Sequence, residues 1–381
     1  MSKRFFINLC AFAFSLYLAR RWKQTNISPY FIGHEVTIVP HIISDDQNEE
    51  LWKLLLGEKL VANQAVEGDK DFDRPDIAPH FFRYGGIEGF KEQVSTLKAR
   101  LSYFKSEKHK LSKLPESVKT VLVNQLQSAC QQPAQFDHDA SSFQFQILLP
   151  GQTTGLQVDA PLVEDKSDIE EWLLAVAASS GLFRLHLVDS LKGVLFLHKW
   201  NSSTFGGSLA YFDKNDAYSK SAGNERNGAV FFRGTHTVYG LSAFRSAQVP
   251  RFLVGRSDLS ISYDEKEQVW EIRNQESRVR TFRSESLHVS LIANGVCSQQ
   301  ERLPKFPSRE AVLGMLMDDL INTNRKSKES LESQSEAVLR KTLIEEYLAY
   351  PPPGRALVPF NFCSLIESYP KGFSFLKPVC G

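Results

Sequence analysis

The sequence predicts an α+β protein in which a double antiparallel sheet, folded as a sandwich or a barrel, is flanked by helices. Short runs of β-branched and aromatic residues recur through the middle of the chain, and Gly, Pro, Asn or Asp residues bound each run. Such runs are typical of strands joined by turns, and their number favours a double sheet over a parallel α/β sheet. The expected strands are residues 143–149, 155–161, 193–200, 206–213, 228–232, 236–239 and 287–292.

Outside these runs, apolar residues recur at spacings of three and four, which predicts amphipathic helices. In residues 308–322, for example, Val312, Leu316 and Leu320 share one face. Between two core strands, a further helix is expected to begin at a capping box, residues 167–170, and to stop before Gly181. The other expected helices are 45–56, 90–104, 117–130 and 337–350; a strand is expected at 35–39, a hairpin at 261–273, and loops at 131–139 and 324–336.

Size and charge exclude some classes of protein. The chain has 381 residues, of which 42% are hydrophobic, so it can bury a large core. Lysine and arginine number 45 against 44 aspartates and glutamates, which gives a formal net charge of +1. This balance, without a clustered basic and aromatic stretch, indicates that nucleic acid is not a partner.

The five cysteines lie far apart and form no Cys-X-X-Cys pair, so neither a zinc site nor a disulfide framework is predicted. A single bridge between Cys363 and Cys380 is left open. The remaining cysteines are Cys10, Cys130 and Cys297.

The N-terminal segment, residues 5–19, is apolar apart from Asn8 and Ser15, and basic residues flank both of its ends. A spanning helix needs about 17–25 residues, so this segment spans a membrane only if the flanking basic side chains snorkel. We expect a membrane anchor that makes a single-pass protein of the endoplasmic reticulum or another endomembrane. A cleaved signal peptide and a mitochondrial presequence are the alternatives. In the secretory lumen, Asn26 and Asn201 would be glycosylation acceptors.

The middle of the chain carries a series of motifs in a suggestive order. An X-Val-Asp motif within an expected strand ends at Asp159, and Gly206-Gly207 opens another strand. The run Gly-Ala-Val-Phe-Phe follows at 228–232, and Thr-Val-Tyr ends at Tyr239. This order resembles the jelly-roll (double-stranded β-helix) core of Fe(II)/2-oxoglutarate-dependent oxygenases. The resemblance implies a jelly-roll core with flanking N- and C-terminal helices.

The resemblance also implies a metal site. The family binds iron with a His-X-Asp pair and a later His, a triad that leaves open positions on the metal. Here the pair reads Gln157-Val-Asp159, and the later position is Tyr239, with His236 three residues earlier. Three residues along a strand turn a side chain to the opposite face, so His236 replaces the missing ligand only if a bulge or a shifted register intervenes. The implied metal positions are therefore Asp159, His236, Gln157 and Tyr239.

For the cosubstrate carboxylate, the family uses an Arg near a final strand, because a guanidinium pairs with a carboxylate through two hydrogen bonds. At the Arg-X-Ser position this chain reads His288-Val-Ser290. Arg251, in a strand-like Pro-Arg-Phe-Leu-Val stretch, is the other candidate. The histidines at 186 and 198, in apolar strand-like runs, are interpreted as structural residues.

Two functions from different classes follow. The first is a membrane-tethered oxygenase-like protein that has lost some or all of its metal chemistry and acts in binding or scaffolding of an unknown protein or small molecule. The resemblance implies Fe(II) and 2-oxoglutarate as cofactors, and for this first function binding of both, of one or of neither is left open. The second is an active 2-oxoglutarate-dependent hydroxylase with an atypical ligand set. The predicted division is 1–22 anchor or signal segment, 23–140 N-terminal helical support, 141–296 jelly-roll core, and 297–381 C-terminal helices and extended tail.

Overall fold

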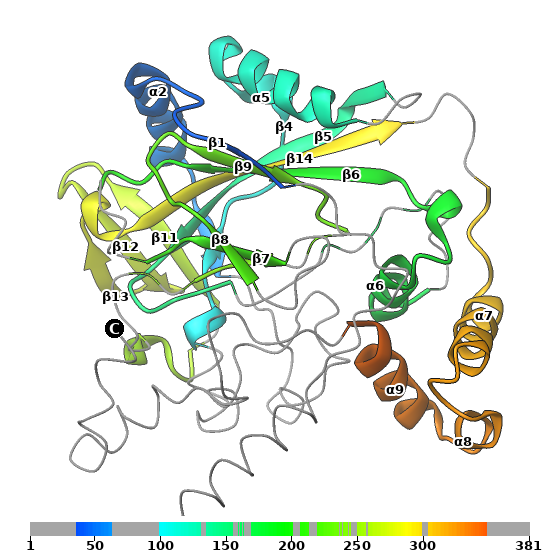
Figure 1. Cartoon of the computed structure of the whole chain (residues 1–381). Coiled ribbons are helices and arrows are strands. Elements are labelled where there is room, and N and C mark those ends of the chain that lie inside the picture. Colours follow the sequence, from blue (N-terminus) through cyan, green and yellow to red (C-terminus); the bar gives the residue numbers. More distant parts are fainter. Residues whose placement is uncertain are drawn as a thin grey trace, which may run out of the picture.

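The computed structural model has two antiparallel sheets, with helices on one side of the larger sheet and a separate group of helices beyond its end (Figure 1). This confirms the mixed helical and antiparallel-sheet architecture expected from the sequence. The structure describes residues 36–62, 99–130, 135–154, 159, 161, 163, 169–200, 206–212, 219–235, 237, 239–242, 244, 250–256, 258–298 and 304–348.

Within the described residues the larger sheet has 11 strands, and the long strand β14 lies in its middle between β5 and β6. Strands from the N-terminal region that we predicted to be helical support also join this sheet. Along the sheet the order is β1 (Thr37–Val39), β9 (Ala229–Phe232), β6 (Asp189–Phe196), β14 (His288–Ser298), β5 (Gln135–Leu148), β3 (Phe104–Lys105), β2 (Leu60–Ala62), β11 (Leu259–Asp264), β12 (Val269–Asn274) and β13 (Ser277–Phe282), with β4 (His109–Lys110) also paired to β5.

One face of this sheet is apolar and covered by two helices, α2 (Asp45–Leu56) and α5 (Glu116–Ala129) (Figure 1). Ser44 and Gln47 form a capping box that starts α2 at the predicted residue. From α2, the Trp52 indole donates a hydrogen bond to the backbone carbonyl of Leu197, 2.7 Å away. The helices predicted at 45–56 and 117–130 are therefore confirmed, and both bury their apolar stripe on the sheet.

The opposite face looks onto the smaller sheet, in which β7 (Leu209–Phe212) lies between β10 (Tyr239–Leu241) and β8 (Ser219–Ala222). Side chains alternate along each strand of the larger sheet, so Phe145 and Ile147 of β5 pack under the helices whereas Gln144 and Gln146 face the smaller sheet. A second apolar cluster joins the two sheets. The space between the sheets is where the predicted site residues meet.

The helical group consists of α6 (Glu171–Ser180), α7 (Arg309–Asn322), α8 (Lys328–Glu332) and α9 (Glu336–Leu348). Its centre is α6, in which residues 172–178 are all buried. A helix that is apolar on every side is buried, and here α7 and α9 cover it. As predicted, α6 stops at Gly181, whose φ of 74° ends the helix in the left-handed conformation.

Four local predictions differ from the structure or lie partly outside the described residues. The loop predicted at 131–139 is strand from Gln135 onward, because β5 continues its pairing with β14 past a β-bulge. Phe104, the predicted end of a helix, lies in β3, and residues 90–98 lie outside the described residues. The loop predicted at 324–336 contains the short helix α8. Residues 167 and 168 of the predicted capping box are not described, and the N-cap Glu170 makes no side-chain capping bond.

A disulfide joins Cys130, at the C-terminal end of α5, to Cys297 in β14. The two cysteines are 167 residues apart in sequence, and their Cα atoms are 5.7 Å apart. Sequence spacing did not indicate this bond, because it depends on how α5 packs across the sheet. Cys363 and Cys380 lie outside the described residues.

Within the described residues, no helix combines the length and the apolar character needed to cross a bilayer. The predicted anchor, residues 5–19, lies outside the described part of the chain.

Candidate functional site

Two of the four predicted metal positions meet between the sheets. The hydroxyl of Tyr239 donates a hydrogen bond to Oδ1 of Asp159 at 2.7 Å. The other two predicted positions, Gln157 and His236, lie outside the described residues. The structure therefore places the expected carboxylate beside the expected phenol.

A lysine that the sequence analysis missed completes this group. Lys192 of β6 is buried, and its ammonium group lies 2.6 Å from Oδ1 of Asp159. The same ammonium donates a hydrogen bond to the hydroxyl of Tyr239. Asp159, Lys192 and Tyr239 thus form a closed triangle of charge-assisted hydrogen bonds. A signal did exist in the sequence: Lys192, Val194 and Phe196 alternate along one strand, so a lysine there faces the same way as two core side chains.

The backbone beside Asp159 is held by a close approach to Gly234. The amide of Asp159 donates to the carbonyl of Gly234 at 2.8 Å. A Cβ atom at position 234 would lie 1.9 Å from Oδ2 of Asp159, so only glycine leaves room for this carboxylate. Asp159 is therefore held against the turn after β9.

A small pocket of about 30 Å³ opens next to the triangle. Apolar side chains from both sheets form part of its wall. The polar part of its wall consists of Lys105, Gln144, Gln146, Thr154, Lys192 and Tyr239.

Burial dominates the electrostatics of this interior. It lowers the pKa of Lys192, an effect that the neighbouring Asp159 carboxylate partly offsets. The pKa of Lys105 is lowered for the same reason, again partly offset by Asp159. Burial, reinforced by Asp159, raises the pKa of Tyr103, whose ring centroid lies 5.1 Å from the Lys105 ammonium. One carboxylate therefore faces two lysines, the buried Lys192 and the half-buried Lys105.

His288, a predicted cosubstrate residue, lies in a different environment. Its side chain is fully buried among Phe196, Trp200 and Phe244, and its Nε2 lies 3.0 Å from the carbonyl oxygen of Gly207. Burial, with a smaller effect from His198, lowers its pKa to about 3, so the ring is neutral at physiological pH. A neutral, enclosed imidazole offers no charge to a carboxylate, so this geometry gives no support to the predicted role.

Arg251 does not lie on the predicted strand. It begins a 3-10 helix, Arg251–Leu253, because the chain turns back after Pro250 and the Leu253 amide bonds the Pro250 carbonyl at 2.9 Å. The side chain of Arg251 is exposed and does not line the pocket. The strand prediction for Arg251 is wrong, and its binding role stays a prediction without support from this position.

The two histidines interpreted as structural both lie within hydrogen-bond distance of backbone carbonyl oxygens. His198 is buried with Nδ1 2.8 Å from the carbonyl oxygen of Trp200 and Nε2 2.7 Å from that of Asn224. Burial lowers its pKa to about 4. His186 lies in a 3-10 helix, Arg184–His186, instead of the predicted strand, with Nδ1 3.1 Å from the Lys305 carbonyl oxygen.

The residues that the structure describes do not fit an Fe(II) centre at Asp159. Such a centre needs neutral nitrogen donors beside the carboxylate. Within the described residues, no group of three or more His, Cys, Asp or Glu side chains with ligand spacing includes Asp159. The carboxylate is instead bound to the cationic Lys192, which repels a second cation.

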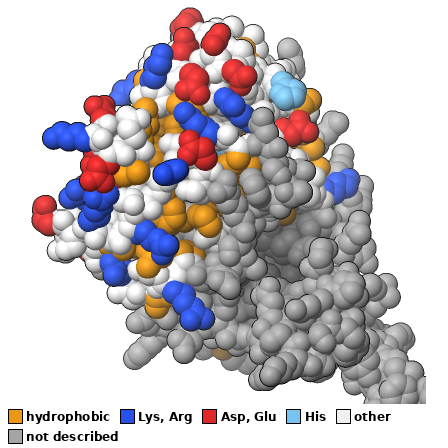
Figure 2. Space-filling model, turned by 90° about the vertical axis from the view of Figure 1, so that its left-hand side faces the viewer, with side chains coloured by type: hydrophobic (Ala, Val, Ile, Leu, Met, Phe, Trp, Pro, Cys, Tyr) orange, Lys and Arg blue, Asp and Glu red, His pale blue; other side chains and the backbone are white. Residues whose placement is uncertain are grey.

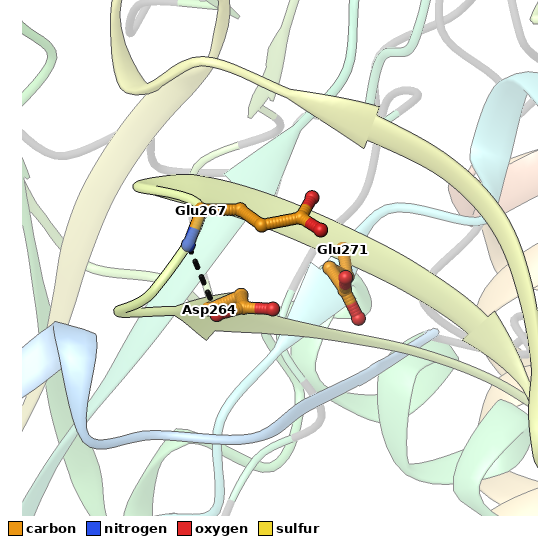
Figure 3. Close-up of side chains that lie close together, drawn as sticks. All are labelled: Asp264, Glu267 and Glu271. Atoms are coloured by element: carbon orange, nitrogen blue, oxygen red, sulfur yellow. Dashed lines mark hydrogen bonds between the residues drawn. The ribbon is translucent and has the colours of Figure 1, made fainter.

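The one such group among the described residues is acidic and lies at the tip of the β11–β12 hairpin (Figure 3). The Asp264 carboxylate accepts hydrogen bonds from the backbone amides of Lys266 and Glu267, which shapes the predicted turn. Arg278 pairs with both Glu267 and Glu271. Because arginine already balances these carboxylates, the cluster is explained as the stabilisation of a hairpin. Figure 2 shows acidic and basic side chains interspersed on the described part of one face.

Comparison with solved structures found similar chains among iron and 2-oxoglutarate enzymes. A prolyl-4-hydroxylase of Pseudomonas putida is 10% identical over 70% of this chain and 94% of its own, with a TM-score of 0.32. A Trichoplax adhaerens prolyl hydroxylase in complex with a hypoxia inducible factor peptide fragment is 8% identical over 74% and 92%, with a TM-score of 0.33. The non-heme alpha ketoglutarate dependent carbocyclase SnoK from nogalamycin biosynthesis is 9% identical over 76% and 89%, with a TM-score of 0.35.

No protein-family model matches the sequence, and comparison with curated proteins gave no match. At TM-scores this low the structural likeness carries no argument about activity. The function proposed below therefore rests on the residues of this chain.

Proposed function

We propose that this chain is a catalytically degenerate, membrane-tethered protein of the oxygenase-like type, and that its site binds a partner or ligand instead of activating oxygen on iron. One observation carries the proposal: the ammonium group of Lys192 occupies both oxygen donors, Asp159 and Tyr239, that the resemblance assigns to the metal. The site thus carries its own cation.

Electrostatics explains why this arrangement opposes metal binding. Two unit charges 4 Å apart interact by roughly 4 kcal/mol at an effective dielectric constant near 20, and a divalent ion doubles that repulsion. Iron would also have to displace the ammonium from Asp159 and leave this buried charge without a counter-charge. A carboxylate and a phenol without imidazole recover little of that free energy.

Anaerobic titration of the full chain in detergent with Fe(II), with and without 2-oxoglutarate, tests the proposal. We expect no stoichiometric iron and no succinate from the native protein. The variant Lys192→Ala exposes Asp159 to added metal and is expected to bind Mn²⁺ more tightly than the native chain, whereas Lys192→Ala/Asp159→Asn is not. Stoichiometric iron together with succinate formation by the native protein would establish the alternative, an active hydroxylase that uses Asp159, His236 and a further histidine.

We propose further that residues 5–19 tether the protein and that its body faces an oxidising compartment, in the first place the lumen of the endoplasmic reticulum. The Cys130–Cys297 disulfide supports this side of the membrane, because disulfides persist in oxidising compartments and are rare in the cytosol. Carbonate extraction should leave the protein in the membrane pellet, and a glycosidase should shift its mobility through Asn26 or Asn201. Release by carbonate would refute the tether, and a mitochondrial location would give a pellet without a mobility shift.

A further inference from the structure

The interior pocket has more positive than negative charge among the described residues. Asp159 is paired with Lys192, and this pair is neutral as a unit. The half-buried Lys105 contributes a second ammonium to the same pocket, and among the described residues it forms no ion pair. Asp159 is the one carboxylate near both ammonium groups among the described residues, and it binds that of Lys192 directly, so the pocket has an excess of positive charge that favours an anion.

A second, independent feature points the same way. Gln146 is 4% exposed, lines the pocket, and its Nε2 has no hydrogen-bond partner. It lies directly opposite Lys105 in the pairing of β3 with β5, so both side chains leave the sheet on the same face. An unsatisfied buried donor costs about 1–3 kcal/mol. The ammonium of Lys105 and the amide of Gln146 are therefore two hydrogen-bond donors on the same pocket, and a ligand with acceptor oxygens would satisfy them.

The volume of the pocket and its apolar wall restrict the class of ligand that would fit. A volume of about 30 Å³ corresponds to about two water-sized positions, which is the size of one carboxylate group. Val194, Leu209 and Ile292 form an apolar wall beside the donors, which suits a short alkyl stem better than a fully hydrated ion such as phosphate.

We propose that this pocket binds the carboxylate of a small organic acid, without a metal ion, through the ammonium of Lys105 and the amide of Gln146. This inference rests on the proposed function, because it assigns the ligand class to a site whose metal chemistry is lost. Asp159 holds Lys192 in place. The carboxylate of the ligand would pair with the ammonium of Lys105.

The test is calorimetric titration of the full chain in detergent and EDTA with propionate, and with propionamide as the neutral isostere. We expect saturable binding of propionate, with propionamide and phosphate at least about tenfold weaker, since a hydrogen bond to a charged group contributes about 1.5–3 kcal/mol. Lys105→Gln should weaken propionate binding about tenfold or more. The matched control Lys110→Gln alters an exposed lysine of β4 and should bind as the native chain does.

Gln146→Leu provides a second test, which holds even if the Lys105→Gln variant does not fold. It removes the unsatisfied donor, so the unliganded variant should melt at or above the native temperature while losing the propionate-induced rise in melting temperature. Equal binding of propionamide, or native binding by Lys105→Gln, would overturn the inference and leave the proposed loss of metal chemistry intact. Propionate binding that appears only when Fe(II) replaces EDTA would overturn both.

Discussion

At the scale of single residues, the interaction between Lys192 and Asp159 decides the character of the site. The lysine comes from the middle of the larger sheet and the carboxylate from a segment 33 residues earlier, yet their charged atoms lie 2.6 Å apart. The Lys192 side chain is 11% exposed and that of Asp159 27%, so water screens the pair only partly. Each charge stabilises the other, and either one alone is unfavourable there.

Removing one charge of this pair should therefore cost more than removing both. We expect Lys192→Met and Asp159→Asn each to lower the free energy of unfolding by about 2–3 kcal/mol, below the range for fully buried pairs because Asp159 is partly exposed. The double variant should be more stable than the sum of the two losses predicts. Urea denaturation of all four proteins completes the cycle, and strictly additive losses would show that the pair is not coupled.

Gly207 is a second residue on which local geometry depends. Its φ is 76°, and a Cβ atom there would lie 2.6 Å from Cδ2 of His288. Gly255 has nearly the same backbone angle, 71°, but a Cβ atom would meet nothing within 4 Å. Alanine at either position strains the backbone, but alanine at 207 also clashes with the His288 ring. Comparing the two variants therefore measures the clash apart from the backbone strain.

We expect Gly255→Ala to cost about 1–2 kcal/mol of unfolding free energy, the cost of a left-handed conformation for a residue with a Cβ atom. Gly207→Ala should cost about 1–3 kcal/mol more, because the ring of His288 has no free space in which to move. Chemical denaturation measures both. Equal losses would mean that the histidine cluster adjusts without strain.

At the scale of elements, the disulfide connects the helical face of the larger sheet to its central strand. It links the end of α5 to β14, which is paired with β5 on one side and β6 on the other. A crosslink that closes a long loop restricts the unfolded chain strongly. We infer that this bond holds α5 on the sheet.

Replacing Cys130 and Cys297 by serine should lower the unfolding free energy by about 2–5 kcal/mol. Dithiothreitol should lower the melting temperature of the native protein to about that of the variant. It should leave the melting temperature of the variant unchanged. A native melting temperature that does not respond to the reductant would contradict the bond. A further fall in the variant would reveal a second bridge, such as one between Cys363 and Cys380.

At the scale of the whole molecule, the larger sheet separates two environments. One face is apolar under α2 and α5, whereas the other combines apolar side chains with the buried Lys192, Gln146, His198 and His288. Polar groups buried there make stability depend on their protonation state. The two buried histidines, His198 and His288, give this dependence its sign.

Both histidines have a pKa below the value near 6.5 of the unfolded chain, about 4 for His198 and about 3 for His288, so the unfolded state binds protons first. Their contribution to stability is complete above about pH 6.5 and is lost as the pH falls toward the folded-state values. The slope is at most about 1.4 kcal/mol per pH unit for each histidine. Urea denaturation of the native protein and of His288→Gln between pH 7 and 4.5 checks this, because other titrating groups cancel in the difference; parallel curves would contradict it.

Local patterns in the sequence were sufficient for most elements. The alternation of Phe143, Phe145 and Ile147 predicted β5, and the spacing of Leu51 and Leu55 predicted α2, because each pattern repeats within a few residues. The beginning of β5 was missed because its pairing with β14 extends past a bulge, and α8 was missed because five residues make less than two helical turns, too few for the apolar spacing to repeat.

The sequence by itself determined most of the strands and helices, and it predicted Asp159 and Tyr239 as partners in one site and His198 as a structural residue. Only the tertiary structure decided that Lys192 is the cation between those two oxygens, that Gln146 faces Lys105, and that Cys130 meets Cys297. The physical reason is range. A periodic pattern reports which face of one element is buried, whereas a contact between elements depends on strand register and helix packing across 33 to 167 residues of chain.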